Sequence, residues 1–450
     1  MRKILISLLL AASFGPATAA TLQVTPLRAL YDQPVHIRLS GLGPGDAVTL
    51  ELDTTDGAGV AWQSRATFRA DANGNVDLEK IRPAAGDYDA IDGMGLFLSM
   101  QPVGKPDASY RSPAAGKGSD ERPPATYHLL ARSQGRTVGR TTLLREQTAA
   151  GISITRIRRD GLVADLYVPA GVRGDGRRHS AVITLGGAEG GLAGGDAYAR
   201  WLASHGFVAL ALGWYHLPGL NNDLIRVPVD TLTTNAIDYL SSLDFVDPQR
   251  IAAMGGSWGG IFALAAAAHT PRLRAVVSWV GSPLVYSGIG RDPKTGAFRN
   301  SNESPFTFDG KPVGFAGYPQ IAKFLKTGDV DPVADAITPI WRISGPVLFI
   351  AGGDDQLGMS GPMARLGIKL LKQHHHAYGD HALIYPQAGH LIWPGYRPTF
   401  NQQKSPPGVP PVGGSPAGYA RADVDCGPRV LAFLHHALDG GTASKAVTIN

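Results

Sequence analysis

The chain has 450 residues, of which 44% are hydrophobic and 8% aromatic, so it can bury large cores and is expected to form two or three domains. Its formal charge of +5 at pH 7 is spread without a basic run, which argues against nucleic acid as a partner. The single cysteine, Cys426, excludes an intrachain disulfide, so hydrophobic cores must hold the fold together.

Residues 1–19 form a predicted signal peptide. They begin with the basic pair Arg2 and Lys3, continue with an apolar stretch over 4–14, and end in Ala17-Thr18-Ala19, a site suited to signal peptidase. The apolar stretch is well short of the ~20 residues that span a bilayer, which favours cleavage over an uncleaved membrane anchor. We therefore expect a periplasmic or secreted protein without a stable membrane anchor.

Alternation of polar and apolar residues predicts half-buried β-strands in the first part of the mature chain. Apolar residues recur at every second position in three segments, 35–39, 48–52 and 62–68. Glycine- and asparagine-rich turns at 41–45 and 73–75 separate these strands, and strand pattern returns at 127–131 and 137–144. This spacing is typical of an antiparallel sandwich, so we predict an all-β immunoglobulin-like domain over residues 20–145.

Residues 146–440 show a different pattern, in which buried apolar runs alternate with longer helical stretches. The runs are AVITLGG (181–187), FVALALG (207–213), RIAAMGG (250–256), AVVSWVG (275–281) and PVLFIAGG (346–353). Strands that read as continuous hydrophobic runs are covered on both faces, which predicts an α/β domain with a mainly parallel sheet flanked by helices. The segment 283–343 is too long for a simple connection, and we expect a lid or a pocket-forming insert there.

Ser257 lies in GGSWGG, between the apolar run that ends at residue 256 and a helix of small residues that begins at Trp258. The G-x-S-x-G pattern alone is common, but the strand-to-helix context is that of a nucleophile elbow. In such a turn a Cβ at Gly255 or Gly259 would collide with neighbouring backbone. We predict that Ser257 is a nucleophile; the alternative is a serine that merely caps a helix.

A serine hydroxyl needs a base, and the base needs an acid that fixes its tautomer. In α/β-hydrolases the acid and then the histidine follow the serine, each at the carboxyl end of a later strand. The run 346–353 leads into Asp354 and Asp355, and the strand pattern ALIYPQAGH ends at His390. The Gly352-x-x-Asp355 spacing favours Asp355 as the acid, with Asp354 as the alternative. For His390 the alternative is a structural role in capping a loop.

Two backbone N–H groups are expected to bind the oxyanion of the tetrahedral intermediate. We assign them to Trp258, the residue after the nucleophile, and to Ala188 in the loop GGAEGG (186–191). That loop lacks the lysine and the spacing of a phosphate-binding loop. The histidines at 374–376 are interpreted as a solvated helix end, so we expect no metal and no cofactor. The proline-rich loop 393–418 is a candidate for part of the entrance to the site.

These motifs resemble the family of acyl-CoA thioesterases and bile acid-CoA:amino acid N-acyltransferase. The resemblance is carried by ALYDQPVHIRLSGLGPGDAVTLEL, RATFRADANGNVDL and DGMGLFLSMQP in the first half, and by GGAEGG, GGSWGG, GGDD and YPQAGHLIWPGY in the second. It implies an α/β-hydrolase fold preceded by an immunoglobulin-like sandwich. Carried over by position, the family's nucleophile falls on Ser257, its acid on Asp355 and its histidine on His390.

The resemblance also implies attack on an acyl carbonyl, an acyl-enzyme on Ser257 and hydrolysis by water. The N-acyltransferase has a cysteine where this chain has Ser257, and the serine favours transfer to water over transfer to an amine. Trp258 stands where relatives often carry a small or basic residue. We expect an exported hydrolase of small-molecule acyl esters or thioesters. The alternatives are an acyltransferase or amidase with the same triad, or a non-catalytic surface-binding protein.

Overall fold

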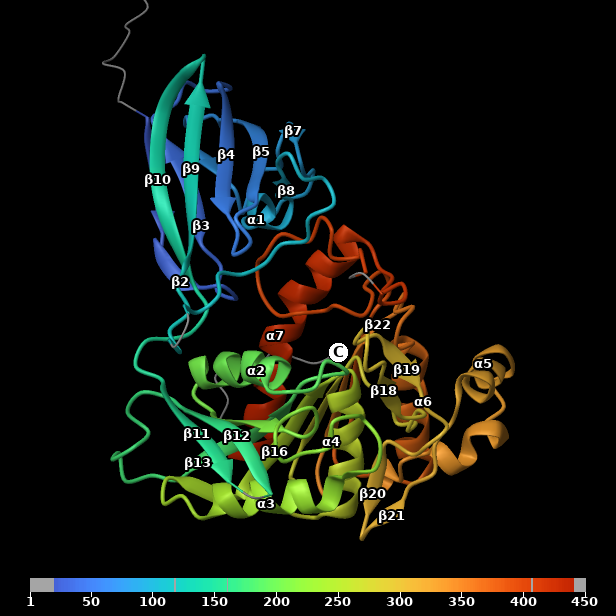
Figure 1. Ribbon diagram of the computed structural model, residues 1–450. Coiled ribbons are helices and arrows are strands. Elements are labelled where there is room, and N and C mark those ends of the chain that lie inside the picture. The colour runs from blue at the N-terminus through green and yellow to red at the C-terminus, as the bar shows by residue number, and fades with distance from the viewer. Residues whose placement is uncertain (1–19, 117–118, 160, 406–407, 441–450) are drawn as a thin grey trace, which may run out of the picture.

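A computed structural model describes residues 20–116, 119–159, 161–405 and 408–440 (Figure 1). The predicted signal peptide at 1–19 lies outside these residues. In Figure 1 a β-rich part, blue to cyan, sits on a larger part in which helices flank a sheet. The predicted fold class, a β-sandwich followed by a mainly parallel α/β sheet, is confirmed.

The N-terminal part contains two sheets that share one core. The smaller sheet has the order β1 (Thr21–Thr25), β3 (His36–Ser40) and β6 (Val76–Asp77). The larger has the order β2 (Arg28–Leu30), β10 (Arg136–Glu146), β9 (Ala125–Ser133), β4 (Ala47–Thr55), β5 (Ala61–Arg69) and β7 (Ala85–Gly86), with β8 (Gln101–Pro102) also on β5. A short helix, α1 (Gly95–Leu98), packs beside β4 and β5.

Buried and outward-facing side chains alternate along the strands of the N-terminal part, as the sequence pattern predicts. In β4 the side chains of Val48, Leu50 and Leu52 are buried while their neighbours face outward, as period-two patterning requires. Ile37 of the smaller sheet and Trp62 of the larger belong to the same buried cluster, so the two sheets pack face to face. The pairing is antiparallel except between β2 and β10, which run parallel.

The second part is built on an eight-stranded sheet. Its order is β11 (Ser153–Arg159), β12 (Leu162–Val168), β14 (Val208–Gly213), β13 (His179–Leu185), β16 (Val246–Gly256), β17 (Val276–Trp279), β22 (Val347–Gly352) and β23 (His381–Tyr385). The first two pairings are antiparallel and the rest are parallel. Every residue of β14, β17 and β22 is buried, as expected for strands covered on both faces.

Helices cover both faces of this sheet. One face packs against α3 (Val229–Ser241), α4 (Trp258–His269) and α6 (Ser360–Gln373), and the other against α2 (Ala193–Ser204) and α7 (Pro416–Asp439). No helix within the described ranges is both long and apolar enough to cross a bilayer.

The segment 283–343 forms small elements outside the main sheet. They are the hairpin β18 (Ile289–Arg291) and β19 (Phe298–Asn300), the strands β20 (Phe306–Phe308) and β21 (Lys311–Pro312), helix α5 (Tyr318–Thr327), and the 3₁₀ turns η1 (Asp331–Ala336) and η2 (Ile340–Arg342). The short strand β15 (Val227–Pro228) pairs with β20. Helix α5 lies at the edge of the molecule in Figure 1, away from the carboxyl end of β16.

Candidate functional site

Ser257 occupies the turn between β16 and α4. Its backbone has φ 53° and ψ −118°, a conformation that residues other than glycine rarely adopt. Its backbone N–H donates to the carbonyl oxygen of Trp279 at 2.7 Å, which ties the turn to the next strand. A Cβ on Gly255 would lie 2.1 Å from the carbonyl oxygen of Gly259, and one on Gly259 would lie 2.4 Å from that of Gly186. The predicted collisions are therefore present, and only glycine allows this turn.

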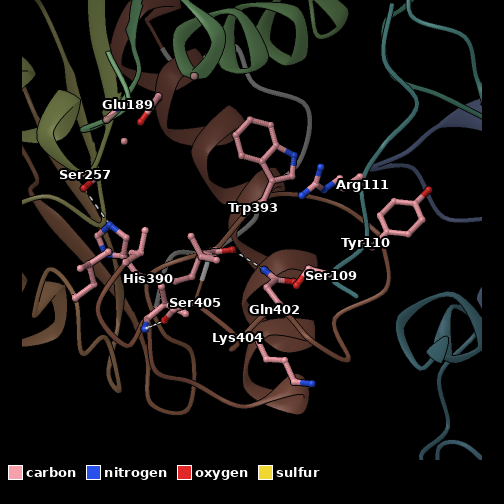
Figure 2. Close-up of a pocket in the computed structure, with 18 of the residues that line it drawn as sticks. Ser109, Tyr110, Arg111, Glu189, Ser257, His390, Trp393, Gln402, Lys404 and Ser405 are labelled. Carbon is pink, nitrogen blue, oxygen red and sulfur yellow. Dashed lines mark hydrogen bonds between the residues drawn. The ribbon is translucent and has the colours of Figure 1, made fainter. Parts of the chain in front are cut away.

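Asp355, His390 and Ser257 form a continuous hydrogen-bonded chain. Nδ1 of His390 lies 2.9 Å from Oδ2 of Asp355. Nε2 of His390 lies 3.0 Å from Oγ of Ser257 (Figure 2). Because a carboxylate only accepts, Nδ1 carries the proton and Nε2 is free to accept the serine hydroxyl. Both side chains of the His390–Asp355 pair are buried. The structure thus brings together the three residues that strand order predicted.

The carboxylate of Asp355 is held by four protein donors besides His390. Oδ1 accepts the backbone N–H of Leu357 at 3.0 Å and of Gly358 at 2.8 Å, while Oδ2 accepts both the N–H and the hydroxyl of Ser360, at 3.2 and 2.5 Å. Burial alone would raise the pKa of Asp355, but His390, Ser360 and Gly358 together hold it below its usual value. The carboxylate therefore stays ionised and fixes the imidazole.

Asp354 has a different task. Its side chain is exposed and accepts the backbone N–H of Gly414 at 2.8 Å and the side-chain amide of Gln356 at 3.1 Å. These bonds fasten the proline-rich loop to the end of β22. The structure places Asp355, not Asp354, against the histidine.

The glycine loop after β13 lies against the nucleophile. A Cβ on Gly187 would be 3.2 Å from the Cβ of Ser257, so backbone here approaches the serine as closely as glycine permits. The N–H of Gly187 donates to Oε1 of Glu189 at 2.9 Å, and the carbonyl of Ala188 accepts the Tyr215 hydroxyl. The assignment of the Ala188 and Trp258 N–H groups to the oxyanion stays a prediction. Trp258 is the first residue of α4, whose N-terminus favours negative charge.

Ser257 and His390 open into a pocket of about 1150 Å³, which we call the catalytic pocket. Figure 2 shows Ser257 and His390 on one side of it and Ser109, Tyr110 and Arg111 on the other. Two loops supply most of the remaining wall, 105–111 from the β-sandwich and 391–412 after the histidine. The expectation that the proline-rich loop borders the site is confirmed. The first domain is expected to shape access to the site, but the residues that it contributes are not apparent from the sequence.

Side-chain bonds hold these two loops together. The amide nitrogen of Asn401 donates to the carbonyls of Pro106 and Ala108 at 2.9 and 2.5 Å, and Lys404 pairs with Asp107 at 2.6 Å. The hydroxyl of Ser109 donates in return to the Asn401 carbonyl at 3.2 Å. The pocket wall is therefore an interdomain contact, built by residues nearly 300 positions apart.

The insert 283–343 contributes less to the pocket than expected. Of the described residues, only Phe298 of this segment borders the catalytic pocket. The guanidinium of Arg291 lies 4.4 Å from the centre of the Phe298 ring and donates to the carbonyl of Glu189 at 2.9 Å. The hairpin β18–β19 thus braces the glycine loop and supplies one residue of the pocket wall, whereas α5 packs on η1.

Of the three histidines after α6, His374 and His375 are exposed, as expected for a solvated helix end, but the side chain of His376 is not. His376 is buried between the carboxylate of Asp380 at 2.7 Å and the carbonyl of Ile343 at 2.8 Å, and His374 stacks on Trp341 at 3.7 Å. These two side chains pin the turn before β23. Within the described part of the chain, no group of three His, Cys, Asp or Glu side chains is arranged to hold a metal ion.

Comparison with known proteins gives matches over both parts of the chain. Residues 32–159 match the family model "Acyl-CoA thioester hydrolase/BAAT N-terminal region", and residues 233–440 match "BAAT / Acyl-CoA thioester hydrolase C terminal". Peroxisomal succinyl-coenzyme A thioesterase of Mus musculus is 28% identical over 438 residues, which cover 95% of this chain and 99% of that protein.

Two further relatives match over a similar length. Acyl-coenzyme A thioesterase 1 of Homo sapiens is 28% identical over 441 residues, covering 94% of this chain and 98% of the relative. Bile acid-CoA:amino acid N-acyltransferase of Mus musculus is 28% identical over 426 residues, covering 92% and 97%. All three matches therefore extend over both parts of the chain described above.

Proposed function

Because this chain belongs to the acyl-CoA thioester hydrolase and BAAT family, we propose that it is a serine hydrolase that cleaves acyl thioesters or esters. The observation that carries the proposal is the continuous chain from the buried Asp355 carboxylate through His390 to the Ser257 hydroxyl. A serine in this arrangement is activated for attack on an acyl carbonyl.

The geometry supports a two-stage reaction. As Ser257 Oγ bonds to the acyl carbon, Nε2 of His390 takes the hydroxyl proton, and Asp355 stabilises the imidazolium that forms. We assign the oxyanion to the backbone N–H groups of Trp258, at the start of α4, and of Ala188, in the glycine loop. His390 then gives its proton to the departing thiol or alcohol. In the second stage His390 activates water, which attacks the acyl-enzyme and frees the acid and Ser257.

A serine nucleophile supports water, rather than an amine, as the acceptor. The family also contains an N-acyltransferase, so the choice needs a direct measurement. Product analysis with and without an added amine acceptor decides it. We expect free acid in both reactions; an N-acyl product as the main species would assign the chain to transfer instead.

We further propose that the enzyme is exported, on the strength of the leader-like composition of residues 1–19. Its substrate pool would then differ from the acyl-CoA of the cytosol. Fractionation of a bacterial host that expresses the full chain, followed by N-terminal sequencing, tests this. A mature protein that starts near residue 20 outside the cytoplasm is the expected result, and an intact chain in the cytoplasm would contradict export.

The catalytic assignment is tested with a fluorophosphonate probe, which labels activated serines. We expect labelling of the wild type, loss of labelling in Ser257→Ala, and turnover in a screen of p-nitrophenyl esters of graded length beside acyl-CoA thioesters. Persistent labelling of Ser257→Ala would place the nucleophile elsewhere. A wild type that neither labels nor turns over any of these compounds would favour a binding protein.

A further inference from the structure

A second cavity, of about 240 Å³, lies between the two domains. It shares Tyr110, Trp393 and Arg397 with the catalytic pocket, so the two spaces are adjacent. Its other walls come from β9, β10 and α2 and from residues outside these elements, namely Tyr31, Ser112, Pro113, Arg122, Gln147 and Tyr396. The volume is several times the ~30 Å³ share of one water molecule, so it can hold a small molecule or one end of a larger one.

The lining of this cavity is strongly basic. Four arginines border it, Arg122, Arg145, Arg200 and Arg397, and among its described lining residues none is acidic. The nearest carboxylate partner, Asp196, is shared, since it pairs with Arg122 at 2.8 Å and with Arg200 at 3.0 Å. One carboxylate therefore balances two guanidinium groups. The other two arginines are each acted on by one buried carboxylate, Asp32 for Arg145 and Asp423 for Arg397, neither within hydrogen-bond distance.

Arg145 is the most deeply buried of the four arginines, with only 2% of its surface exposed. Its Nη2 donates to the carbonyls of Tyr31, at 3.1 Å, and Gln33. Within the described residues, Nε and Nη1 have no hydrogen-bond partner and no ion pair. Burial lowers the pKa of Arg145 to about 10, so the group still carries its charge at neutral pH. A buried cation with free donors is costly unless an anion meets it.

Arg397 adds a second incompletely paired cation. Its Nε lies 3.8 Å from Oδ2 of Asp423, beyond hydrogen-bond distance, and finds no hydrogen-bond partner in the described part of the chain. Both Arg145 and Arg397 therefore border one cavity and hold N–H donors without a hydrogen-bond partner among the described residues, although these nitrogen atoms are themselves covered by protein.

We propose that this space, called the anion cavity below, binds a single oxyanion, either a carboxylate or a phosphate group of a small molecule. Guanidinium groups bind both with charge-assisted hydrogen bonds, and a small shift of the Arg145 side chain would bring its unpaired donors to the ligand. The oxyanion belongs either to the far end of a substrate whose acyl bond lies at Ser257 or to a free anion. The binding step needs no turnover, so it can be tested apart from the proposed function.

Calorimetric titration of the full-length Ser257→Ala protein with inorganic phosphate and with succinate, at constant ionic strength, measures binding without catalysis. We expect saturable binding of at least one of them, weakened tenfold or more in Arg122→Met and Arg145→Met. Arg140→Met is the matched control, since Arg140 lies exposed on the same strand as Arg145 and outside the cavity. Arg122→Met keeps the test valid if Arg145→Met fails to fold, because Arg145 also holds two backbone carbonyls.

Kinetics with Ser257 intact distinguishes the two sources of the oxyanion. If the substrate carries it, Arg122→Met raises KM about tenfold for an ester with a terminal carboxylate, or for a thioester whose thiol carries phosphate, but not for p-nitrophenyl butyrate. If the anion is free, phosphate or succinate binds in the titration and the KM values of charged and uncharged substrates shift equally. The absence of both saturable binding and a charge-selective KM effect would overturn the proposal.

Discussion

The buried carboxylate of Asp423, on α7, accepts the backbone N–H of Trp393 at 2.8 Å. Its other oxygen accepts the side-chain amide of Gln402 at 3.1 Å. Trp393 and Gln402 both border the catalytic pocket, so one acid on the last helix fixes the shape of the loop that follows His390. Burial raises the pKa of Asp423 to about 7, although Arg397, Trp393 and Gln402 each act to lower it.

This raised pKa predicts a loss of stability as pH rises. The carboxyl of an unfolded Asp has a pKa near 4. Between about pH 4 and pH 7 the folded protein keeps the proton that the unfolded chain has lost, so the free energy of unfolding falls over this range. Above about pH 7 the stabilisation from this proton is gone. In Asp423→Asn this contribution is absent, and we expect a smaller difference between the free energies of unfolding at pH 5 and pH 7.5. Urea denaturation at the two pH values measures it.

Asp425→Asn is the matched control for that experiment, because Asp425 lies on the same helix and pairs with Arg429 at the surface. An Asp423→Asn protein whose stability keeps the full pH dependence of the wild type would contradict the assignment.

Replacing each of the two neighbouring aspartates in turn should show which of them is the acid of the triad. Without the carboxylate of Asp355, the imidazole of His390 loses the acceptor that fixes its tautomer, and we expect Asp355→Asn to lower kcat by about 10³ to 10⁴. Asp354→Asn removes a loop-fastening group and should cost less than about tenfold. Steady-state kinetics on a p-nitrophenyl ester compares them. The reverse order of the two effects would move the acid to Asp354.

The hydroxyl of Ser360 should act on catalysis through Asp355. Its bond to Oδ2 helps hold the pKa of Asp355 low, so Ser360→Ala should raise that pKa and lower kcat by about tenfold or more. The acid side of the pH–rate profile should move to higher pH. In an Asp355→Asn background the same change should have little further effect. Equal losses in both backgrounds would mean that Ser360 acts on packing alone.

The elbow glycines should tolerate no side chain. Gly259→Ala places a Cβ 2.4 Å from a backbone oxygen, so we expect both the thermal unfolding temperature and the labelling by a fluorophosphonate to fall sharply. Gly116→Ala is the control, since its Cβ would meet no atom within 4 Å. Wild-type labelling in Gly259→Ala would show that the turn can relax.

The order of strands along the sequence was enough to predict which three side chains meet. Ser257 and Asp355 each follow a buried apolar run, and His390 follows the half-buried strand β23. The carboxyl ends of parallel strands gather at one edge of a sheet. Local glycine and turn signals placed them to the residue, although Asp354 remained an alternative until the contacts of the two carboxylates were compared.

The contact between the two domains that completes the pocket wall could not be predicted in this way. Asn401 meets Pro106 and Ala108 only because the sandwich docks on the hydrolase sheet, and no periodic pattern encodes that contact. The same limit applies to His376, whose burial depends on Asp380 and on Ile343, which lies 33 residues earlier in the chain. Periodic sequence patterns indicate local structure and strand order, whereas the packing of one domain on the other depends on the shapes of their surfaces.

Residues 105–111 of the sandwich face Ser257 across the catalytic pocket. Substrate selectivity therefore depends on both domains, which occupy separate parts of the sequence. Exchange of the sandwich between relatives could therefore redirect the enzyme while the machinery for bond cleavage stays untouched. Conversely, the hydrolase domain expressed alone would keep its nucleophile but expose it to bulk water. We expect such a protein to remain reactive and to lose its selectivity among substrates.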